Sequence, residues 1–477
     1  MNLNHAVQAP ALGKRLLRVA VVGSGPSGFY AAEALLNAPG LAVEVDMFDR
    51  LPTPYGLVRG GVAPDHQKIK SVILVYEKVA AKTGFRFFGN IHIGKDLSTE
   101  ELSLHYDQVV FAVGNETDRR LGIPGEDLTG SRSATEFVGW YNGHPDHHHH
   151  QFDLSCDKVA VVGIGNVAMD VTRILAQDPD HLAKTDIADY ALDALRKSRV
   201  REVFLLGRRG PAQAAFSPTE IKEIGELHSA DLVVLPEEAA LDDASASLTL
   251  EPNDKKNVGY VQERARLGEG TKNKKVRLRF CVSPVEIIGE RGRVAAIKIE
   301  KNTLIKDDRG NIKAKGAGRF ETLPVGMVLR SVGYHGIALP GVPFDAKSGH
   351  IPNENGRVID AQTKKIVPGA YVVGWAKRGP SGLIGTNRAD SVATVQAMLE
   401  DAVRPASGNA PKKSSQAVVD LLRTKNLRFV TFEDWKALDR LEIESGARKG
   451  KIRDKFTVVD EMLSALEAAK KGPAFSA

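Results

Sequence analysis

Three glycines near the start of the sequence have a spacing that suits the binding of a dinucleotide phosphate. In "RVAVVGSGPSGFY", Gly23, Gly25 and Gly28 form the pattern Gly-x-Gly-x-x-Gly. The first glycine permits a tight turn, the second lets the backbone approach a pyrophosphate, and the third allows a helix to pack closely on a strand. The phosphates would lie at the N-terminus of that helix, where N–H groups and the helix dipole attract anions.

A second stretch repeats the pattern with one change. In "KVAVVGIGNVAMD", Gly163, Gly165 and Ala168 occupy the same three places. A lone glycine pattern is a weak signal because turns and helix caps also use glycine. Two copies, each after a Val-rich apolar run, indicate two dinucleotide sites.

The end of the following strand distinguishes the two copies. After the first, "VEVDMFDR" contains Asp49, whose carboxylate can accept hydrogen bonds from both hydroxyls of an unphosphorylated ribose. After the second, "REVFLLGRRGP" contains Arg208 and Arg209, two guanidinium groups that suit a 2′-phosphate. An arginine pair is more commonly a solvated basic turn, but its place at a strand end favours phosphate. The second copy is therefore predicted to bind NADP.

Parallel strands and helices must position these residues. The runs "RVAVVG" and "KVAVVG" are typical of strands buried on both faces, and a helical pattern follows each. "TDIADYALDALRKS" predicts an additional amphipathic helix that begins near Thr185. Two further strands lead into Gly114 and Gly333, where we expect the chain to cross between domains.

"DRRLGIPGEDL" resembles the linkers of flavoproteins that bind two dinucleotides. With this resemblance, the sequence predicts an α/β fold with two Rossmann-like dinucleotide-binding domains, the NADP domain inserted in the FAD domain. We expect four segments: the first part of the FAD domain, the NADP domain, the second part of the FAD domain, and a helical C-terminal extension, which are residues 1–115, 116–335, 336–405 and 406–477.

Composition narrows the class of protein. The 477 residues exceed what one core usually holds, and 42% hydrophobic with 26% charged residues is typical of a globular protein. No apolar run approaches the roughly 20 residues of a membrane span, and no signal-peptide core precedes the first strand. The two cysteines, Cys156 and Cys281, form no Cys-x-x-Cys pair, which disfavours a disulfide scaffold, a zinc site or a redox dithiol. We expect a cytoplasmic location.

The charge balance bears on partners. A net charge of +6 and a pI near 9.0 favour acidic partners through long-range attraction. No stretch interleaves clustered lysines and arginines with aromatics, so a nucleic-acid partner is not expected.

Five blocks of sequence together resemble a ferredoxin-NADP reductase of the adrenodoxin-reductase type. They are "GSGPSG", "TPYGLVRGGVAPDHQKIK", "GNVAMD", "GRRGPAQAAFSPTEIKEI" and "GWAKRGPSGLIGTN". The tail from Asp434 is similar to the family's closing helical segment, although Lys451-Ile452-Arg453 stands where relatives tend to carry Arg-Pro-Arg.

The resemblance implies an enzyme that takes a hydride from NADPH to FAD and passes the electrons one at a time to a ferredoxin-type iron–sulfur protein. The two cysteines cannot hold a cluster, so the metal would belong to the partner, and no metal site is predicted on this chain. An acidic ferredoxin would be drawn to a basic rim, and a flavodoxin is the alternative acceptor.

The resemblance also implies which residues bind each cofactor. Leu57 would lie against the flavin ring, within a segment whose Pro and Gly content predicts a rigid surface loop. Trp375 can pack on an aromatic ring, and neighbouring glycines give the flavin access to backbone N–H groups. The predicted FAD residues are Gly23, Gly25, Ser27, Gly28, Asp49, Leu57, Trp375, Gly382, Leu383 and Ile384. The predicted NADP residues are Gly163, Gly165, Asn166, Val167, Arg208, Arg209 and Glu220.

Three residues are predicted to serve catalysis. By resemblance His66 lies near the nicotinamide, although a loop histidine more often makes only a structural hydrogen bond. Ser217 or Thr219 can cap a helix that places Glu220 and Glu223 one turn apart, and the family's match to Glu223 approaches the histidine. Asp170 follows "GNVAM", where an acid near a pyrophosphate is unfavourable unless it is hydrogen-bonded, so we interpret it as a positioning or proton-linked group.

Other functions are weighed against this one. A thioredoxin-reductase-like disulfide reductase needs a dithiol that the sequence lacks. An electron-input subunit like that of glutamate synthase would normally carry cysteine-rich cluster motifs. A flavin and NADP redox sensor without turnover is the alternative from another class. The run "HPDHHHH" from His144 could suggest a metal site, but it is predicted to be an exposed loop that binds metal only adventitiously, and no function is assigned to it.

Overall fold

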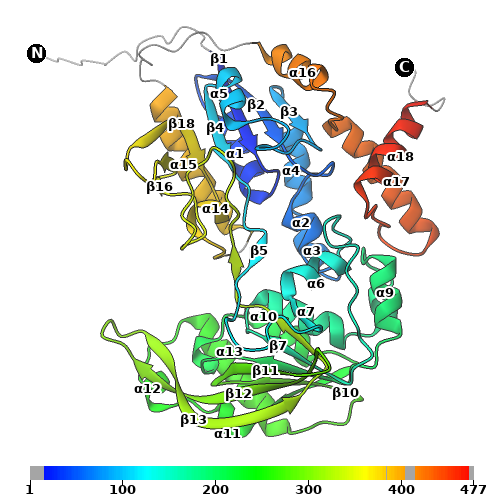
Figure 1. Cartoon of the computed structure of the whole chain (residues 1–477), viewed down its shortest axis with the longest axis vertical. Helices are drawn as coiled ribbons and strands as arrows, with labels where there is room; N and C mark the ends of the chain where they lie inside the picture. The colour runs from blue at the N-terminus through cyan, green and yellow to red at the C-terminus, as the bar shows by residue number, and fades with distance from the viewer. Residues whose placement is uncertain (1–15, 383, 403–413, 472–477) are drawn as a thin grey trace, which may run out of the picture. The chain divides into compact units, whose positions relative to one another are not determined.

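The computed structural model describes residues 16–382, 384–402 and 414–471 (Figure 1). The chain divides into two compact units. Unit 1 contains the described residues up to Val58, together with Ser71–Asn115 and His335–Ala437. Unit 2 contains Arg59–Lys70, Glu116–Tyr334 and the described residues from Leu438 onward.

Unit 1 is built on a seven-stranded sheet with the order β16-β17-β18-β4-β1-β2-β3. The pairs β1–β2, β1–β4, β2–β3 and β4–β18 are parallel, whereas β17 is antiparallel to both of its neighbours. The strands are β1 (Leu16–Val22), β2 (Ala42–Phe48), β3 (Phe85–Phe88), β4 (Gln108–Phe111), β16 (Asn353–Glu354), β17 (Arg357–Ile359) and β18 (Ile366–Val372).

Helices cover this sheet, and α1 and α15 pack directly against each other (Figure 1). Residues of the sheet, α5 and α16 form a continuous hydrophobic core. The helices are α1 (Pro26–Leu36), α4 (Ile73–Ala80), α5 (Thr99–His105), α14 (Trp375–Arg378), α15 (Thr386–Ala402) and α16 (Ser415–Thr424). Two more, α2 (Leu57–Gly60) and α17 (Phe432–Arg448), contain a boundary between the units.

Unit 2 contains a six-stranded sheet with the order β6-β14-β7-β8-β10-β9, in which every pair is parallel. Helices cover one face of this sheet and the antiparallel strands of residues 282–324 cover the other, which explains why "KVAVV" and "EVFLL" are almost wholly apolar. The strands are β6 (Ser131–Ser133), β7 (Lys158–Val162), β8 (Glu202–Leu206), β9 (Ala230–Val234), β10 (Lys274–Arg279) and β14 (Met327–Arg330).

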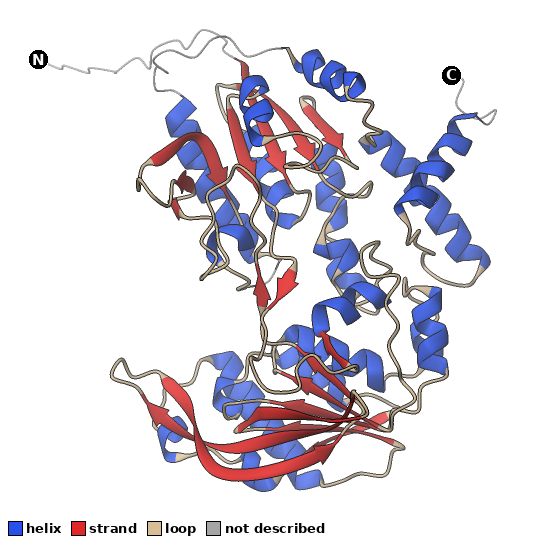
Figure 2. Cartoon of the chain, viewed as in Figure 1, coloured by secondary structure: helices blue, strands red, loops and turns tan. Residues whose placement is uncertain are grey.

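A three-stranded antiparallel sheet of long strands completes unit 2 (Figure 2). Its strands are β11 (Val282–Glu290), β12 (Arg293–Lys306) and β13 (Ile312–Pro324), and the short β5 (Thr117–Asp118) and β15 (Tyr334–His335) form a separate pair. The helices are α3 (Gln67–Lys70), α6 (Ala134–Tyr141), α7 (Asn166–Ala176), α8 (Pro179–Leu182), α9 (Asp189–Arg196), the 3₁₀ turn Pro211–Gln213, α10 (Pro218–Gly225), α11 (Pro236–Ala239), α12 (Asp243–Ala246), α13 (Pro252–Leu267) and α18 (Val459–Lys471).

The predicted α/β fold with two Rossmann-like sheets is confirmed. Each glycine pattern lies between a central parallel strand and a helix, at β1–α1 and at β7–α7. Within the part of the chain that the structure describes, none of the helices has the length and apolarity needed to cross a bilayer.

Three local predictions need correction. The additional helix exists but begins at Asp189, because Thr185 Oγ1 accepts a hydrogen bond from the N–H of Ile187 and forms a turn instead. The segment around Leu57 is not simply a surface loop: Tyr55 is 2% exposed, and α2 forms one helical turn. The ring of Tyr55 packs against Phe29, and its hydroxyl accepts a hydrogen bond from Trp435 at 3.2 Å. Burial of these aromatic side chains therefore outweighs the loop preference of the local Pro and Gly residues.

The histidine run also differs from the exposed loop that we predicted. The side chains of His144 and His150 are only 17% and 16% exposed. A Cβ at Gly139 of α6 would lie 2.2 Å from the ring of His147, so the run packs against this helix. The glycine makes room for the imidazole rings.

Candidate functional site

The first glycine turn leaves open space at one glycine and none at the other two. Gly23 has φ +106°, and a Cβ there would lie 2.4 Å from the carbonyl oxygen of Ala112. A Cβ at Gly28 would lie 2.2 Å from the carbonyl oxygen of Gly23. A Cβ at Gly25 would meet nothing within 4 Å. Gly25 is the N-cap residue of α1 and cannot cap it with a side chain, so this opening fits a phosphate group.

The second glycine turn has the same geometry. Gly163 has φ +117°, and a Cβ would lie 2.1 Å from the carbonyl oxygen of Ser331. Gly165, the N-cap residue of α7, again has no atom within 4 Å of a built Cβ. Ala168 is fully buried at the third position, where its methyl group fits between helix and strand. Both turns therefore fit the phosphates of a dinucleotide.

Asp49 follows β2 and is fixed against the first glycine turn. Its Oδ2 accepts hydrogen bonds from the N–H of Ser24 at 3.0 Å and from the Ser24 hydroxyl, and its Oδ1 accepts one from the N–H of Leu51 at 2.9 Å. A carboxylate oxygen can accept more than one hydrogen bond, so the group can still receive a ribose hydroxyl. Asp49 also holds the backbone of the turn.

Two further predicted segments meet the first glycine turn within unit 1. A Cβ at Gly374, which precedes Trp375, would lie 2.1 Å from the hydroxyl oxygen of Ser27, and a Cβ at Gly56 would lie 2.9 Å from the Cα of Gly25. Leu57, directly after Gly56, is 38% exposed. The backbone thus approaches the turn from both segments, as a bound cofactor requires.

The segment after Trp375 is rich in unusual backbone conformations. Gly379 and Gly382 have φ of +83° and +82°, and Ile384 lies just before α15. Leu383 is outside the described residues. Asp390 of α15 accepts a hydrogen bond from the N–H of Gly374 at 2.7 Å, which fixes the start of this segment.

Arg208 and Arg209 lie at the carboxyl end of β8, next to the end of β7. Arg208 is exposed and Arg209 is half-buried, and neither forms an ion pair with a described carboxylate. Burial and the neighbouring charge of Arg208 lower the pKa of Arg209. Their backbone is held, because Cys281 N–H donates to the carbonyl of Arg209 and Asn302 to that of Arg208. Two adjacent cations without a counter-ion fit a phosphate group.

The three predicted catalytic residues meet within unit 2. His66 Nε2 lies 2.8 Å from Glu223 Oε2, and His66 Nδ1 lies 3.5 Å from Asp170 Oδ1. Ser217, rather than Thr219, caps α10 and so places Glu223 one turn inside the helix. The histidine is therefore held between two carboxylates.

Arg173 and Asp65 complete this cluster, and the sequence analysis missed both. The guanidinium of Arg173 donates to Asp65 at 2.8 and 2.9 Å, to Asp170 at 2.7 Å and to Glu220 at 3.2 Å. Its side chain is 3% exposed. The available signals were the Asp-x-x-Arg spacing on one helix face and an acid directly before His66.

The pKa values of the side chains around His66 are shifted from their ordinary values in both directions. Burial, together with the charge of Asp170, raises the pKa of Glu220 to about 7. Burial opposes protonation of His66, but its hydrogen bond to Glu223 raises the pKa overall, and the same bond lowers the pKa of Glu223. Burial also raises the pKa of Asp170. The cluster can therefore hold and exchange protons near neutral pH.

A metal ion is a poorer occupant of this cluster. Ligand atoms of His66, Asp170 and Glu220 lie within 4.8 Å of one another. The guanidinium of Arg173 already contacts all three of these residues, and its positive charge would repel a second cation.

Asn166 connects the second glycine turn to the cluster. Its Oδ1 accepts a hydrogen bond from the N–H of Ser217 at 2.9 Å, and Gly165 forms a parallel bridge with Ala215. The residue that begins α7 therefore sets where α10 begins. Val167 follows it and packs against the hydrophobic core of unit 2.

Comparisons with known proteins agree with this geometry. Residues 17–198 match the family described as pyridine nucleotide-disulphide oxidoreductase. The chain is 44% identical over 457 residues to the NADPH-ferredoxin reductase FprA of Mycobacterium leprae, covering 93% of this chain and 97% of that protein. It is 38% identical over 463 residues to the mitochondrial NADPH:adrenodoxin oxidoreductase of Arabidopsis thaliana, covering 94% of this chain and 95% of that protein.

A solved structure is similarly close. Mycobacterium tuberculosis FprA in complex with NADPH superposes with a TM-score of 0.90 at 43% identity, covering 95% of this chain and 100% of that one.

Proposed function

The chain belongs to the ferredoxin-NADP reductase family of the adrenodoxin-reductase type, and on this premise we propose that it is an NADPH-dependent flavoprotein reductase of a ferredoxin-type iron–sulfur protein. One observation carries the assignment of the two sites. Both glycine turns leave the same opening for a phosphate, and the second has beside it two arginines that form no ion pair with a carboxylate in the described part of the chain.

In this proposal the first turn holds FAD. The helix α1 presents its N-terminal N–H groups to the pyrophosphate, and Asp49 receives the ribose. The resemblance to the family assigns Leu57, Trp375, Gly382, Leu383 and Ile384 to flavin binding. FAD, when bound, supplies the chemistry that accepts a hydride and releases electrons singly.

The second turn holds NADPH in the same proposal. The N-terminus of α7 receives the pyrophosphate, with Gly165, Asn166 and Val167 along it, and Arg208 with Arg209 receives the 2′-phosphate. Burial raises the pKa of Glu220 to about 7, and a carboxyl group of this kind suits a ribose hydroxyl because it can donate or accept a hydrogen bond according to its protonation.

His66, Asp170 and Glu223 position the reacting end of NADPH and hold a proton there. The short hydrogen bond from His66 to Glu223 fixes the orientation of the imidazole, and Arg173 fixes Asp170. This arrangement needs no acid or base for hydride transfer itself, because cofactors carry that chemistry.

The proposal extends to domains, partner and location. Residues 1–115 and 336–405 form the FAD domain, 116–335 the NADP domain, and 406–477 the extension. The partner is an acidic ferredoxin, with a flavodoxin as a second acceptor, since the chain carries a net charge of +6. The location is cytoplasmic.

Anaerobic stopped-flow mixing tests the proposal. The purified protein should be yellow, NADPH should bleach its flavin band much faster than NADH, and a reduced acceptor should accumulate when ferredoxin is added. A colourless protein, or equal bleaching by both nucleotides, would contradict the two site assignments. Fast bleaching without any electron acceptor among ferredoxins and flavodoxins would favour the redox sensor instead.

A further inference from the structure

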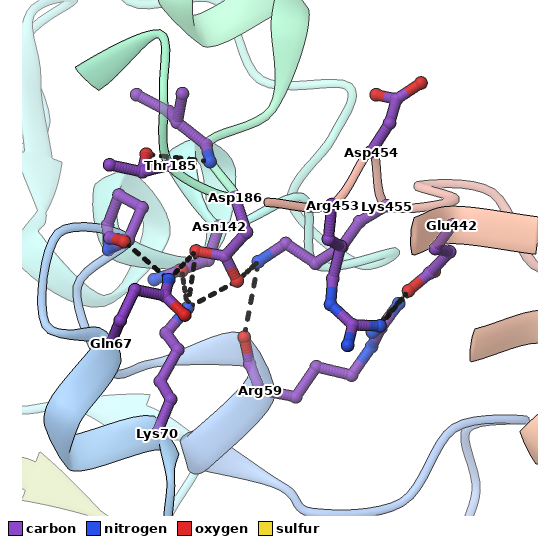
Figure 3. A network of polar contacts seen from close by, with 12 residues as sticks. Arg59, Gln67, Lys70, Asn142, Thr185, Asp186, Glu442, Arg453, Asp454 and Lys455 are labelled. Atoms are coloured by element: carbon purple, nitrogen blue, oxygen red, sulfur yellow. Dashed lines mark hydrogen bonds and ion pairs between the residues drawn. The ribbon is translucent and has the colours of Figure 1, made fainter. Parts of the chain in front are cut away.

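The short segment that carries His66 is held by a buried carboxylate. His66 directly precedes α3, and both Gln67 and Lys70 of this helix donate to Asp186 (Figure 3). Lys70 Nζ lies 2.7 Å from Asp186 Oδ2, and Gln67 Nε2 lies 3.1 Å from Oδ1. The two charged side chains are 6% and 7% exposed. Asp186 therefore fixes the side of the segment that follows His66.

A lysine from near the C-terminus completes this contact. Lys455 Nζ lies 3.1 Å from Asp186 Oδ2 and donates to the carbonyl oxygen of Arg59 at 3.5 Å (Figure 3). Its side chain is 1% exposed. Burial lowers the pKa of both Lys455 and Lys70, because it removes their ammonium groups from water. Burying two lysines beside one carboxylate is costly, and what these contacts supply that apolar packing would not is a specific connection between distant segments.

A second contact holds the other end of the segment. Glu442 of α17 accepts hydrogen bonds from both terminal nitrogens of Arg59, one of them at 2.9 Å, and its side chain is fully buried. Arg453 and the N–H of Phe456 donate to the same carboxylate, at 2.9 and 3.0 Å. Residues 442–455, here called the support segment, thus contact the Arg59–Lys70 segment at its first residue directly and at its last residue through Asp186.

We propose that the support segment is a positioning element for catalysis, which acts by fixing Arg59–Lys70 and so keeps His66 oriented toward Glu223. This role rests on the proposed function, since it concerns the residue assigned to the reacting end of NADPH. A misplacement of about 1 Å at a reacting group can lower the rate by up to ~100-fold. Fixing the segment that carries His66 should therefore have a measurable effect on the rate. The helical extension then has a function that its sequence pattern does not reveal.

Lys455→Met tests the proposal in the full-length protein. Methionine keeps most of the length of the side chain without its ammonium group and relieves the repulsion of Lys70, so the fold should persist. Lys449→Met is the matched control, because Lys449 also lies in the support segment but pairs with Asp189 and Asp454 and is 46% exposed. Each change is also combined with His66→Gln.

The first readout is the rate at which NADPH bleaches the flavin band. Lys455→Met should slow it roughly tenfold in the otherwise native protein and change it little when His66 is already Gln, since coupled residues give non-additive effects. Lys449→Met should leave both rates unchanged. Equal slowing by Lys455→Met in the two backgrounds would overturn the proposal, because the effect would not pass through His66.

The second readout is hydrogen exchange of the amides of residues 59–70, followed by mass spectrometry. Exchange should accelerate in Lys455→Met and not in Lys449→Met. Unchanged exchange and an unchanged rate would refute a positioning role. A native protein that NADPH fails to reduce would contradict the proposed function instead, while the exchange data would still show whether the support segment holds Arg59–Lys70.

Discussion

Replacing Arg208 and Arg209 by alanine should remove most of the preference for NADPH over NADH. A charge-assisted hydrogen bond contributes about 1.5–3 kcal/mol, or roughly 10- to 150-fold in affinity. Arg208 is exposed, which places its contribution at the lower end, whereas half-buried Arg209 should contribute more. The double variant should therefore lose roughly 10²–10³-fold in discrimination.

The structure also predicts what the double variant should retain. Neither guanidinium pairs with a described carboxylate, so their removal leaves no acid unpaired and should relieve their mutual repulsion. The unfolding midpoint should stay the same or rise slightly, and binding of NADH should not change. Arg201→Ala is the control, because Arg201 is exposed at the opposite end of β8.

The assay is anaerobic stopped-flow reduction over a range of NADPH and NADH concentrations, which separates apparent affinity from the limiting rate. Titration with 2′-AMP and with AMP gives the same comparison without turnover. An unchanged NADPH-to-NADH ratio in the double variant would refute the assignment of the second glycine turn. An equal loss of both nucleotides would show that the arginines support the fold and do not recognise the 2′-phosphate.

Three further changes probe the glycine turns and the charged cluster around His66. Gly165→Ala should fold normally and lose nucleotide binding, because its Cβ enters the open space predicted to hold a phosphate. Gly163→Ala should unfold, because its Cβ would lie 2.1 Å from a carbonyl oxygen. Melting curves with and without NADPH distinguish a loss of binding from a loss of folding. The folded-state pKa of Glu220 is raised from 4.5 to about 7 and that of His66 is raised above 6.5, so the folded protein retains protons that the unfolded chain releases. The free energy of unfolding should then fall as pH rises from about 5 to about 8, and Glu220→Gln should flatten this dependence below about pH 7. Denaturant titrations at several pH values measure this free energy. If the pKa of Glu220 is not raised, the variant and the native protein will show the same dependence on pH. Arg173→Met should cost about 3–5 kcal/mol of stability, with a smaller loss at acidic pH where the carboxylates are protonated, and an equal loss at every pH would contradict a role in charge compensation.

The residues that compensate the charges around His66 could not be predicted from the sequence. Asp170 and Arg173 are one turn apart on α7, but Asp65 and Glu220 come from distant segments, so only folding shows that all three acids share one guanidinium. The same limit applies to Asp186, Glu442 and Lys455, because in the sequence they cannot be distinguished from ordinary surface charges. Their importance depends on burial, and burial is a property of the folded chain.

Sequence alone determined the glycine turns, the acid and the arginine pair that follow them, and the α/β fold, because these depend on short-range backbone geometry and on strand and helix periodicity. The aromatic burial of Tyr55 could not be read in this way, since the local Pro and Gly content pointed to a loop and contacts with Phe29 and Trp435 overrode it. Only the tertiary structure shows which partners surround His66, and that residues 442–455 contact the segment that carries it. Such contacts join residues hundreds of positions apart, and their strength comes from exclusion of water, which no local pattern encodes.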